Sequence, residues 1–186
     1  MFPCMRFVEL EIGGVWLVEP VRHGDHRGYF SETFRRDEFE AAVGRVDFVQ
    51  DNESLSRRGV VRGLHFQRGP AAQAKLVRVS RGTVLDVAVD IRLGSPTFGR
   101  HVAVELSGDN GRQLFVPRGM AHGFAVLSDE AQFQYKVDNA YCPECEATLR
   151  FDDAALGIDW RVPREEMVLS DKDMRGVPFS EIVGLL

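Results

Sequence analysis

Short strand-like segments account for most of the sequence. They are rich in β-branched and aromatic residues, and Gly, Pro, Asn or Asp separates one from the next. This short, regular spacing is typical of a β-sandwich or a β-barrel. The predicted strands are Val15–Val18, Tyr29–Phe34, Phe48–Ser56, Val60–Gln67, Ala74–Ser80, Thr83–Ile91, His101–Leu106, Gln113–Val116 and Gln132–Val137.

Helical patterns are few. The clearest is Asp37–Val43, which Gly44 closes. A second short helix is predicted near Asp153–Leu156, and a C-terminal turn around Ser180–Leu186.

Alternation along two strands predicts which side chains point inward. Phe133, Tyr135 and Val137 share one face of their strand, so Tyr135 is expected inside the barrel among apolar neighbours. Gln50, Asn52, Ser54 and Ser56 likewise share a face. So polar a stripe indicates either a lined cavity or an outer surface. A tyrosine in the position of Tyr135 is more often a core aromatic residue than a catalytic one.

Length and charge narrow the class of protein. A chain of 186 residues suits one domain that folds without disulfides. The net charge is −5 and no Lys/Arg-rich patch is present, so the electrostatic footprint of a nucleic-acid-binding protein is missing. The sequence contains neither a secretory leader nor an apolar run of membrane-spanning length. We therefore predict a cytoplasmic protein with no membrane or nucleic-acid partner.

The segment from Gly59 to Lys75 carries three groups suited to chemistry: Arg62, His65 and Lys75. If its two strands lie near each other in one sheet, an imidazole base and an ammonium cation converge, which suits proton abstraction beside a carbonyl. A lone strand histidine is more often structural. Lys75, however, is one of only three lysines among 23 basic residues, which favours a required point charge.

Arg62 and His65 are three residues apart, so strict alternation puts them on opposite faces. Either Gly63 carries a bulge, or Arg62 serves a different site, for example one across a subunit boundary.

Two further motifs suggest metal or redox chemistry, but the residues around them favour neither. Pro117–Phe124 has the Pro-x-Gly-x-x-His pattern of a metal-binding cupin's second motif, but Gln67 stands where such cupins have a second histidine, so no catalytic metal is predicted. Cys4, Cys142 and Cys145 make an odd count, and the last two are predicted to be free thiols in a turn.

The order of motifs resembles the dTDP-4-dehydrorhamnose 3,5-epimerase family, which are cupin-like enzymes acting on nucleotide-linked 4-keto-6-deoxy sugars. The resemblance covers roughly residues 15–173. It is carried by the segments 25–32, 48–52, 62–67, 73–79, 86–90, 117–124, 135–136, 141–146 and 169–173. It implies an all-β, double-stranded antiparallel β-helix (jelly roll) with a few short helices. We expect a single domain over 1–186, with a core of about 15–160 and an extension at 161–186 that contributes Asp173.

The resemblance also implies roles for single residues. His65 would remove the protons from carbons 5 and 3, and Asp173 would orient its imidazole. Lys75 would stabilise the enolate oxygen, and Tyr135 would protonate the opposite face. Further matching positions imply substrate contacts, with the arginines suited to the diphosphate and Tyr141 to the thymine base: Arg27, Phe30, Glu32, Gln50, Asp51, Asn52, Arg62, His122, Tyr141, Glu146 and Lys172.

The predicted activity is epimerisation of dTDP-4-dehydro-6-deoxy-D-glucose at carbons 3 and 5, without a cofactor, in a homodimer whose subunits share substrate contacts. Ala140 stands where the family often has a second tyrosine. Three alternatives remain open at this point: a mono-epimerase inverting one carbon, a metal-dependent cupin enzyme using His65 and His122, and a sugar-binding module without activity.

Overall fold

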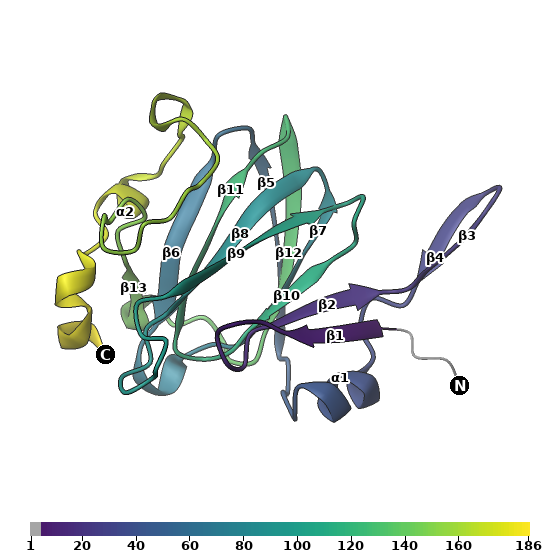
Figure 1. Ribbon diagram of the computed structural model, residues 1–186, viewed down its shortest axis with the longest axis horizontal. Helices are drawn as coiled ribbons and strands as arrows, with labels where there is room; N and C mark the ends of the chain where they lie inside the picture. Colours follow the sequence, from purple (N-terminus) through teal and green to yellow (C-terminus); the bar gives the residue numbers. More distant parts are fainter. Residues whose placement is uncertain (1–4) are drawn as a thin grey trace.

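The computed structural model describes residues 5–186, and it consists mainly of two antiparallel sheets that face each other (Figure 1). In spatial order, the larger sheet contains β1 (Met5–Glu9), β2 (Trp16–Pro20), β10 (Gln113–Val116), β7 (Lys75–Arg81), β12 (Glu130–Val137) and β5 (Gln50–Arg57). The smaller contains β13 (Glu146–Thr148), β6 (Val61–Gln67), β11 (Met120–Val126), β8 (Thr83–Asp90) and β9 (His101–Ser107). The predicted double-stranded antiparallel barrel is confirmed.

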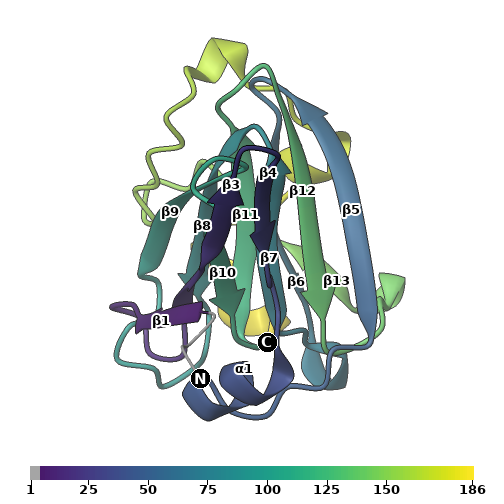
Figure 2. The same cartoon turned by 90° about the vertical axis from the view of Figure 1, so that its right-hand side faces the viewer.

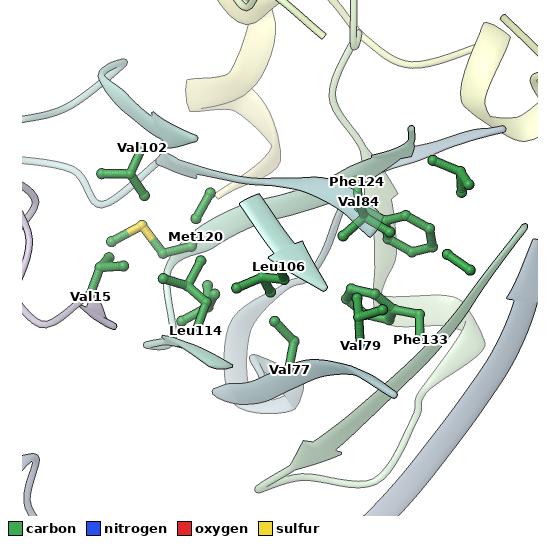
Figure 3. Close-up of a cluster of buried hydrophobic side chains, with 14 of the residues drawn as sticks. Val15, Val77, Val79, Val84, Val102, Leu106, Leu114, Met120, Phe124 and Phe133 are labelled. Atoms are coloured by element: carbon green, nitrogen blue, oxygen red, sulfur yellow. The ribbon is translucent and has the colours of Figure 1, made fainter. Parts of the chain in front are cut away.

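The main core fills the space between the two sheets. Figure 3 shows Val77, Val79 and Phe133 of the larger sheet with Val84 and Phe124 of the smaller one, all buried. The rings of Phe124 and Phe133 stack with their centroids 4.2 Å apart. Inward positions along β7 and β12 alternate with polar ones, so burial of apolar area fixes the register of these strands.

The C-terminal segment covers the outer face of the smaller sheet (Figure 1). It includes the 3₁₀ turns η3 (Arg164–Glu166) and η4 (Phe179–Leu185), and between them the helix α2 (Asp171–Met174). Ile182 is fully buried against this sheet. Because β8 and β11 are covered on both faces, their sequences are nearly continuous apolar runs.

The helical predictions were partly correct. Helix α1 (Arg36–Ala42) and η4 confirm the first and the last. The helix predicted near Asp153–Leu156 is wrong: this segment forms turns, because Asp153 accepts hydrogen bonds from the amides of Ala155 and Phe179 and thereby ties the turn to the C-terminal segment. Two more 3₁₀ turns are η1 (Gly69–Ala71) and η2 (Pro143–Cys145). Within residues 5–186 no helix is long and apolar enough to cross a membrane.

A hairpin of β3 (Arg22–Asp25) and β4 (Gly28–Ser31) extends away from the two sheets in Figure 1, and in Figure 2 it lies in front of them. Its side chains Tyr29 and Phe30 are 61% and 69% exposed. A two-stranded ribbon with exposed aromatics buries little surface of its own. Within residues 5–186, no apolar side chains cover these two aromatic residues.

Candidate active site

A pocket of about 380 Å³ opens between the two sheets, near their edge strands β5 and β13. Side chains from both sheets line it, together with residues from the loop before β13 and from α2. The sequence-predicted residues that line it are Gln50, Asn52, Arg62, His65, Lys75, His122, Tyr135, Tyr141, Glu146 and Lys172. The polar stripe of β5 thus faces a cavity, which was one of its two predicted readings.

His65 is held by Asp173, which lies behind it on α2. His65 Nε2 is 2.7 Å from Asp173 Oδ1. The backbone amide of Gly63 donates to the same oxygen at 3.0 Å, and the Ser170 hydroxyl donates to Oδ2 at 2.5 Å. Asp173 is only 3% exposed. Burial raises the pKa of its carboxyl, but these hydrogen bonds outweigh burial and the net pKa is well below the ordinary value.

The ionised Asp173 determines which nitrogen of His65 can act as a base. A carboxylate accepts, so His65 Nε2 carries the proton that it donates to Asp173. Nδ1 is then left with a free lone pair. The geometry thus fixes the orientation of the imidazole and turns Nδ1 away from the carboxylate, as a general base requires.

Arg62 and His65 share the pocket because β6 carries a bulge. His65 pairs with His122 across the ladder, whereas Arg62 pairs with Phe124, so three steps along β6 match two along β11. Gly63 lies at this irregularity with φ of 122°, a conformation that favours glycine. The bulge proposed at Gly63 is therefore confirmed. Arg62 Nε donates to Ser56 Oγ at 3.1 Å, which links the two sheets.

Lys75 faces His65 from the other sheet. Their strands were expected to lie near each other in one sheet, and this was wrong. Strands β6 and β7 are consecutive, but η1 carries the chain from one sheet to the other. Burial lowers the pKa of Lys75 to about 8, while the carboxylates of Asp86 and Glu146 partly oppose that effect and the charge of Lys172 adds to it. The ammonium is thus poorly solvated and ready to pair with an anion.

Tyr135 projects from β12 into the same pocket. It packs against the main core, as alternation predicted, and Lys75 Nζ lies 6.0 Å from the centre of its ring. Burial raises the pKa of the phenol, Glu146 raises it further, and Arg62 opposes them. A phenol with a raised pKa is protonated at neutral pH, so it can donate a proton.

His122 has a buried partner that the sequence analysis did not single out. Its Nε2 lies 3.0 and 3.1 Å from the two oxygens of Asp86, a residue that is 0% exposed. The sequence could have indicated Asp86, because it is a charged residue in the middle of an apolar strand. Such residues are rarely buried without a partner. Ser170, which caps α2 and orients Asp173, was likewise missed.

A network at the rim of the pocket joins Tyr141, Glu146 and Lys172. Tyr141 donates its hydroxyl to Glu146 at 2.7 Å, and Lys172 forms an ion pair with the other Glu146 oxygen. Burial raises the pKa of Glu146, but these two partners outweigh it and the net pKa is lowered. Gln50 and Asn52 complete the rim with a hydrogen bond of 2.8 Å between their side chains.

Four predicted residues do not reach this pocket. Asp51 lies on the opposite face of β5, where it pairs with Lys136 at 2.9 Å and lines a separate hollow on the outside of the sheet. Strict alternation explains this, since both its neighbours Gln50 and Asn52 point inward. Arg27 and Phe30 belong to the projecting hairpin, and Glu32 follows it and pairs with Arg35. Arg27 instead binds Asp25 within the hairpin.

The prediction for the cysteines was wrong. Cys142 and Cys145 are joined by a disulfide, because the 3₁₀ turn η2 brings their Cα atoms to 5.3 Å, within the range a disulfide spans. Cys4 lies outside the described residues.

Within residues 5–186, no group of three or more His, Cys, Asp or Glu side chains converges as a metal site would require. The absence of a catalytic metal stays a prediction, and metal analysis of the purified protein tests it.

Comparisons with known proteins agree with this arrangement. The family model described as dTDP-4-dehydrorhamnose 3,5-epimerase matches residues 9–181. A dTDP-4-dehydrorhamnose 3,5-epimerase of Shigella flexneri is 52% identical over 176 residues, which cover 94% of this chain and 96% of the relative.

Two solved structures are also similar. One is a dTDP-6-deoxy-D-glucose-3,5-epimerase of Legionella pneumophila in complex with dTDP-4-keto-L-rhamnose, with a TM-score of 0.94, 46% identity, and coverage of 98% of this chain and 97% of the other. The second is a 3'-monoepimerase of Streptomyces bikiniensis in complex with dTDP-quinovose, with a TM-score of 0.88, 39% identity, and coverage of 96% and 91%. The chain therefore belongs to the dTDP-4-dehydrorhamnose 3,5-epimerase family, as its motifs predicted.

Proposed function

We propose that this protein epimerises dTDP-4-dehydro-6-deoxy-D-glucose at carbons 3 and 5 to give dTDP-4-dehydro-L-rhamnose. The observation that carries the proposal is the convergence of a carboxylate-bound imidazole, an ammonium and a phenol in one pocket. Relatives that match nearly the whole chain are named for this reaction, which supports two carbons over one.

His65 begins the reaction. Carbons 3 and 5 both flank the carbonyl at carbon 4, so the protons on them are acidified and leave an enolate behind. His65 Nδ1 takes the proton, and the imidazolium that forms is stabilised by the carboxylate of Asp173 at 2.7 Å. Lys75 stabilises the negative charge on the carbonyl oxygen, and this stabilisation is strong because the ammonium is poorly solvated.

Tyr135 completes the inversion. Protonation from the side from which the proton left returns the starting sugar, whereas protonation from the other side inverts the carbon. Tyr135 comes from the sheet opposite to His65, and its raised pKa keeps it protonated. The enolate therefore takes its new proton from the phenol. The phenolate is then reprotonated from solvent and the His65 imidazolium releases its proton to solvent, which restores both groups.

The nucleotide is held at the rim. Arg62 is suited to a bidentate contact with the diphosphate, and Tyr141, 51% exposed, offers a ring for stacking on the thymine base. Gln50, Asn52, His122, Glu146 and Lys172 supply further polar contacts to sugar and nucleotide.

A homodimer is the second part of the proposal. The exposed Tyr29 and Phe30 give the hairpin an apolar surface that a partner can cover, and this would bring Arg27, Phe30 and Glu32 to the partner's pocket. Sedimentation of the wild type as a dimer and of Phe30→Ser as a monomer is expected. A monomeric wild type contradicts this part.

The cytoplasmic location predicted from the sequence is also part of the proposed function.

The test of the function uses the purified protein and dTDP-4-dehydro-6-deoxy-D-glucose. We expect conversion to the L-rhamno product, loss of turnover in His65→Ala with an unchanged circular dichroism spectrum, and full activity in His101→Ala, a histidine on β9 away from the pocket. A mono-epimerase yields a product inverted at one carbon only. A folded His65→Ala variant that remains active contradicts the proposal.

A further inference from the structure

The Cys142–Cys145 disulfide lies between two residues of the pocket rim. Tyr141 directly precedes the first cysteine and Glu146 directly follows the second, and both line the pocket. The disulfide therefore closes the base of the turn that presents these two side chains.

The same turn is attached at each of its ends, to Gln67 at the end of β6 and to Arg68, which follows it. The amide of Cys142 donates to Gln67 Oε1 at 2.7 Å. The amide of Arg68 donates to the carbonyl of Cys145 at 2.9 Å, and its guanidinium donates to the carbonyl of Glu144 at 2.8 Å. The disulfide joins the two attachment points, so its reduction allows one end of the turn to move relative to the other.

The chemical groups that would break and form C–H bonds are held by other parts of the fold. His65, Lys75 and Tyr135 are on β6, β7 and β12, inside hydrogen-bonded sheets, and Asp173 is anchored by its own capping bonds. Glu146 begins β13 and pairs with Gln67 of β6, whereas Tyr141 lies in the loop before the turn. A change in the turn thus alters the position of Tyr141 most, with its hydrogen bond to Glu146, and leaves the reacting groups in place.

The bond is accessible and closes only a short ring. Both cysteines are half-buried and lie next to the exposed Pro143 and Glu144. A ring of four residues adds little entropic stabilisation to the whole fold, because the effect grows with the length of the closed loop. In reducing compartments, an accessible disulfide of this kind is more often a redox-sensitive element than a permanent one.

We propose that the Cys142–Cys145 pair is a redox-sensitive element that sets the affinity of the pocket for the nucleotide part of the substrate, which deepens the function proposed above and rests on it. In the disulfide form Tyr141 and Glu146 are held at the rim, and in the dithiol form they must be ordered on binding. A dithiol reductant supplies the change: its thiolate attacks one sulfur, its second thiolate resolves the mixed disulfide, and two electrons and two protons pass to the cysteines.

The test compares one protein in its two oxidation states. After treatment with oxidised glutathione and desalting, thiol titration of the unfolded wild type should find one free thiol, and after dithiothreitol it should find three. On reduction we expect KM for the dTDP-sugar to rise about tenfold, the size expected when two side chains must be ordered on binding. The value of kcat should stay within about twofold.

Cys142→Ser/Cys145→Ser is the matched control, and binding of dTDP measured by calorimetry is a readout that needs no catalysis. The double variant should bind like the reduced wild type and ignore dithiothreitol, while Cys4→Ser should respond as the wild type does. Equal dTDP affinity and KM in the two oxidation states overturns the proposal, as do three titratable thiols after oxidised glutathione. An oxidised protein that binds dTDP tightly but converts no sugar contradicts the proposed function. The comparison of dTDP affinity between the two oxidation states then still tests this inference.

Discussion

Lys75→Met should abolish epimerisation and stabilise the fold at neutral pH. Burial lowers the pKa of Lys75 from 10.5 to about 8, so keeping it charged in the folded protein costs about 3 kcal/mol. Methionine has a similar length and carries no charge to desolvate. At pH 7 the variant should therefore gain about 3 kcal/mol, a rise in Tm of about 6 to 12 °C for a chain of this size.

The sign of the pH dependence follows from the same pKa. Between about pH 8 and 10.5 the unfolded chain binds more protons at Lys75 than the folded one, so wild-type stability rises with pH over that window. The advantage of the variant should shrink accordingly and vanish above about pH 10.5. In the wild type, kcat/KM should fall about tenfold between pH 7 and pH 9, because the charged fraction of Lys75 in the free enzyme falls by about that factor.

Thermal unfolding and kcat/KM measured from pH 6 to 10 check both effects. Lys136→Met is the matched control, because Lys136 points outward and pairs with Asp51, so its profile of kcat/KM against pH should match that of the wild type. Burial raises the pKa of Tyr135, which moves the titration of this phenol further from that of Lys75. A flat profile of kcat/KM up to pH 10, or a Lys75→Met variant that keeps wild-type kcat/KM, would refute the role given to this ammonium.

Three other variants test the arrangement around it. Asp173→Asn should lower kcat by about a hundredfold or more, as loss of a histidine's orienting carboxylate does elsewhere. The pKa of this carboxyl is lowered in the folded protein, so the wild type should lose stability to urea when the pH is lowered beneath about 4. Tyr135→Phe should keep solvent exchange of the substrate protons but slow inversion about a hundredfold, and equal losses of both rates would contradict its role. Gly63→Ala should destabilise by about 2 kcal/mol or more, because its Cβ would lie 2.6 Å from the Gly123 Cα, whereas Gly13→Ala meets nothing within 4 Å and should be neutral.

Strand alternation predicted only part of the site, and side-chain chemistry and the family resemblance predicted the rest. Alternation along β12 put Tyr135 on the inward face, whereas along β5 it showed only that Asn52 belongs to a polar stripe on one face, either a cavity lining or an outer surface. The structure pairs these two residues directly across the ladder. The same rule, applied to the positions that the family resemblance suggested, would have excluded Asp51. A motif read as a string of letters does not distinguish the two faces of a strand.

Other features depend on tertiary context that local patterns do not contain. Strand β11 was missed because Met120, Ala121 and Gly123 at its start are weak strand formers and, as all seven of its residues are buried, no alternation marks it. The disulfide was missed because the odd cysteine count argued against a disulfide framework, while a single four-residue ring needs only a tight turn. The sequence left two explanations for the spacing of Arg62 and His65, a bulge at Gly63 or a different site for Arg62. Only the pairing of β6 with β11 decided between them.

The most direct measurement follows the substrate's ring protons by NMR in heavy water. Incubation of the protein with dTDP-4-dehydro-6-deoxy-D-glucose should replace the protons on carbon 3 and carbon 5 by deuterium and invert both carbons. Exchange and inversion at one carbon alone would show a mono-epimerase. No exchange at either carbon in a folded protein that binds dTDP would contradict proton abstraction by His65 altogether.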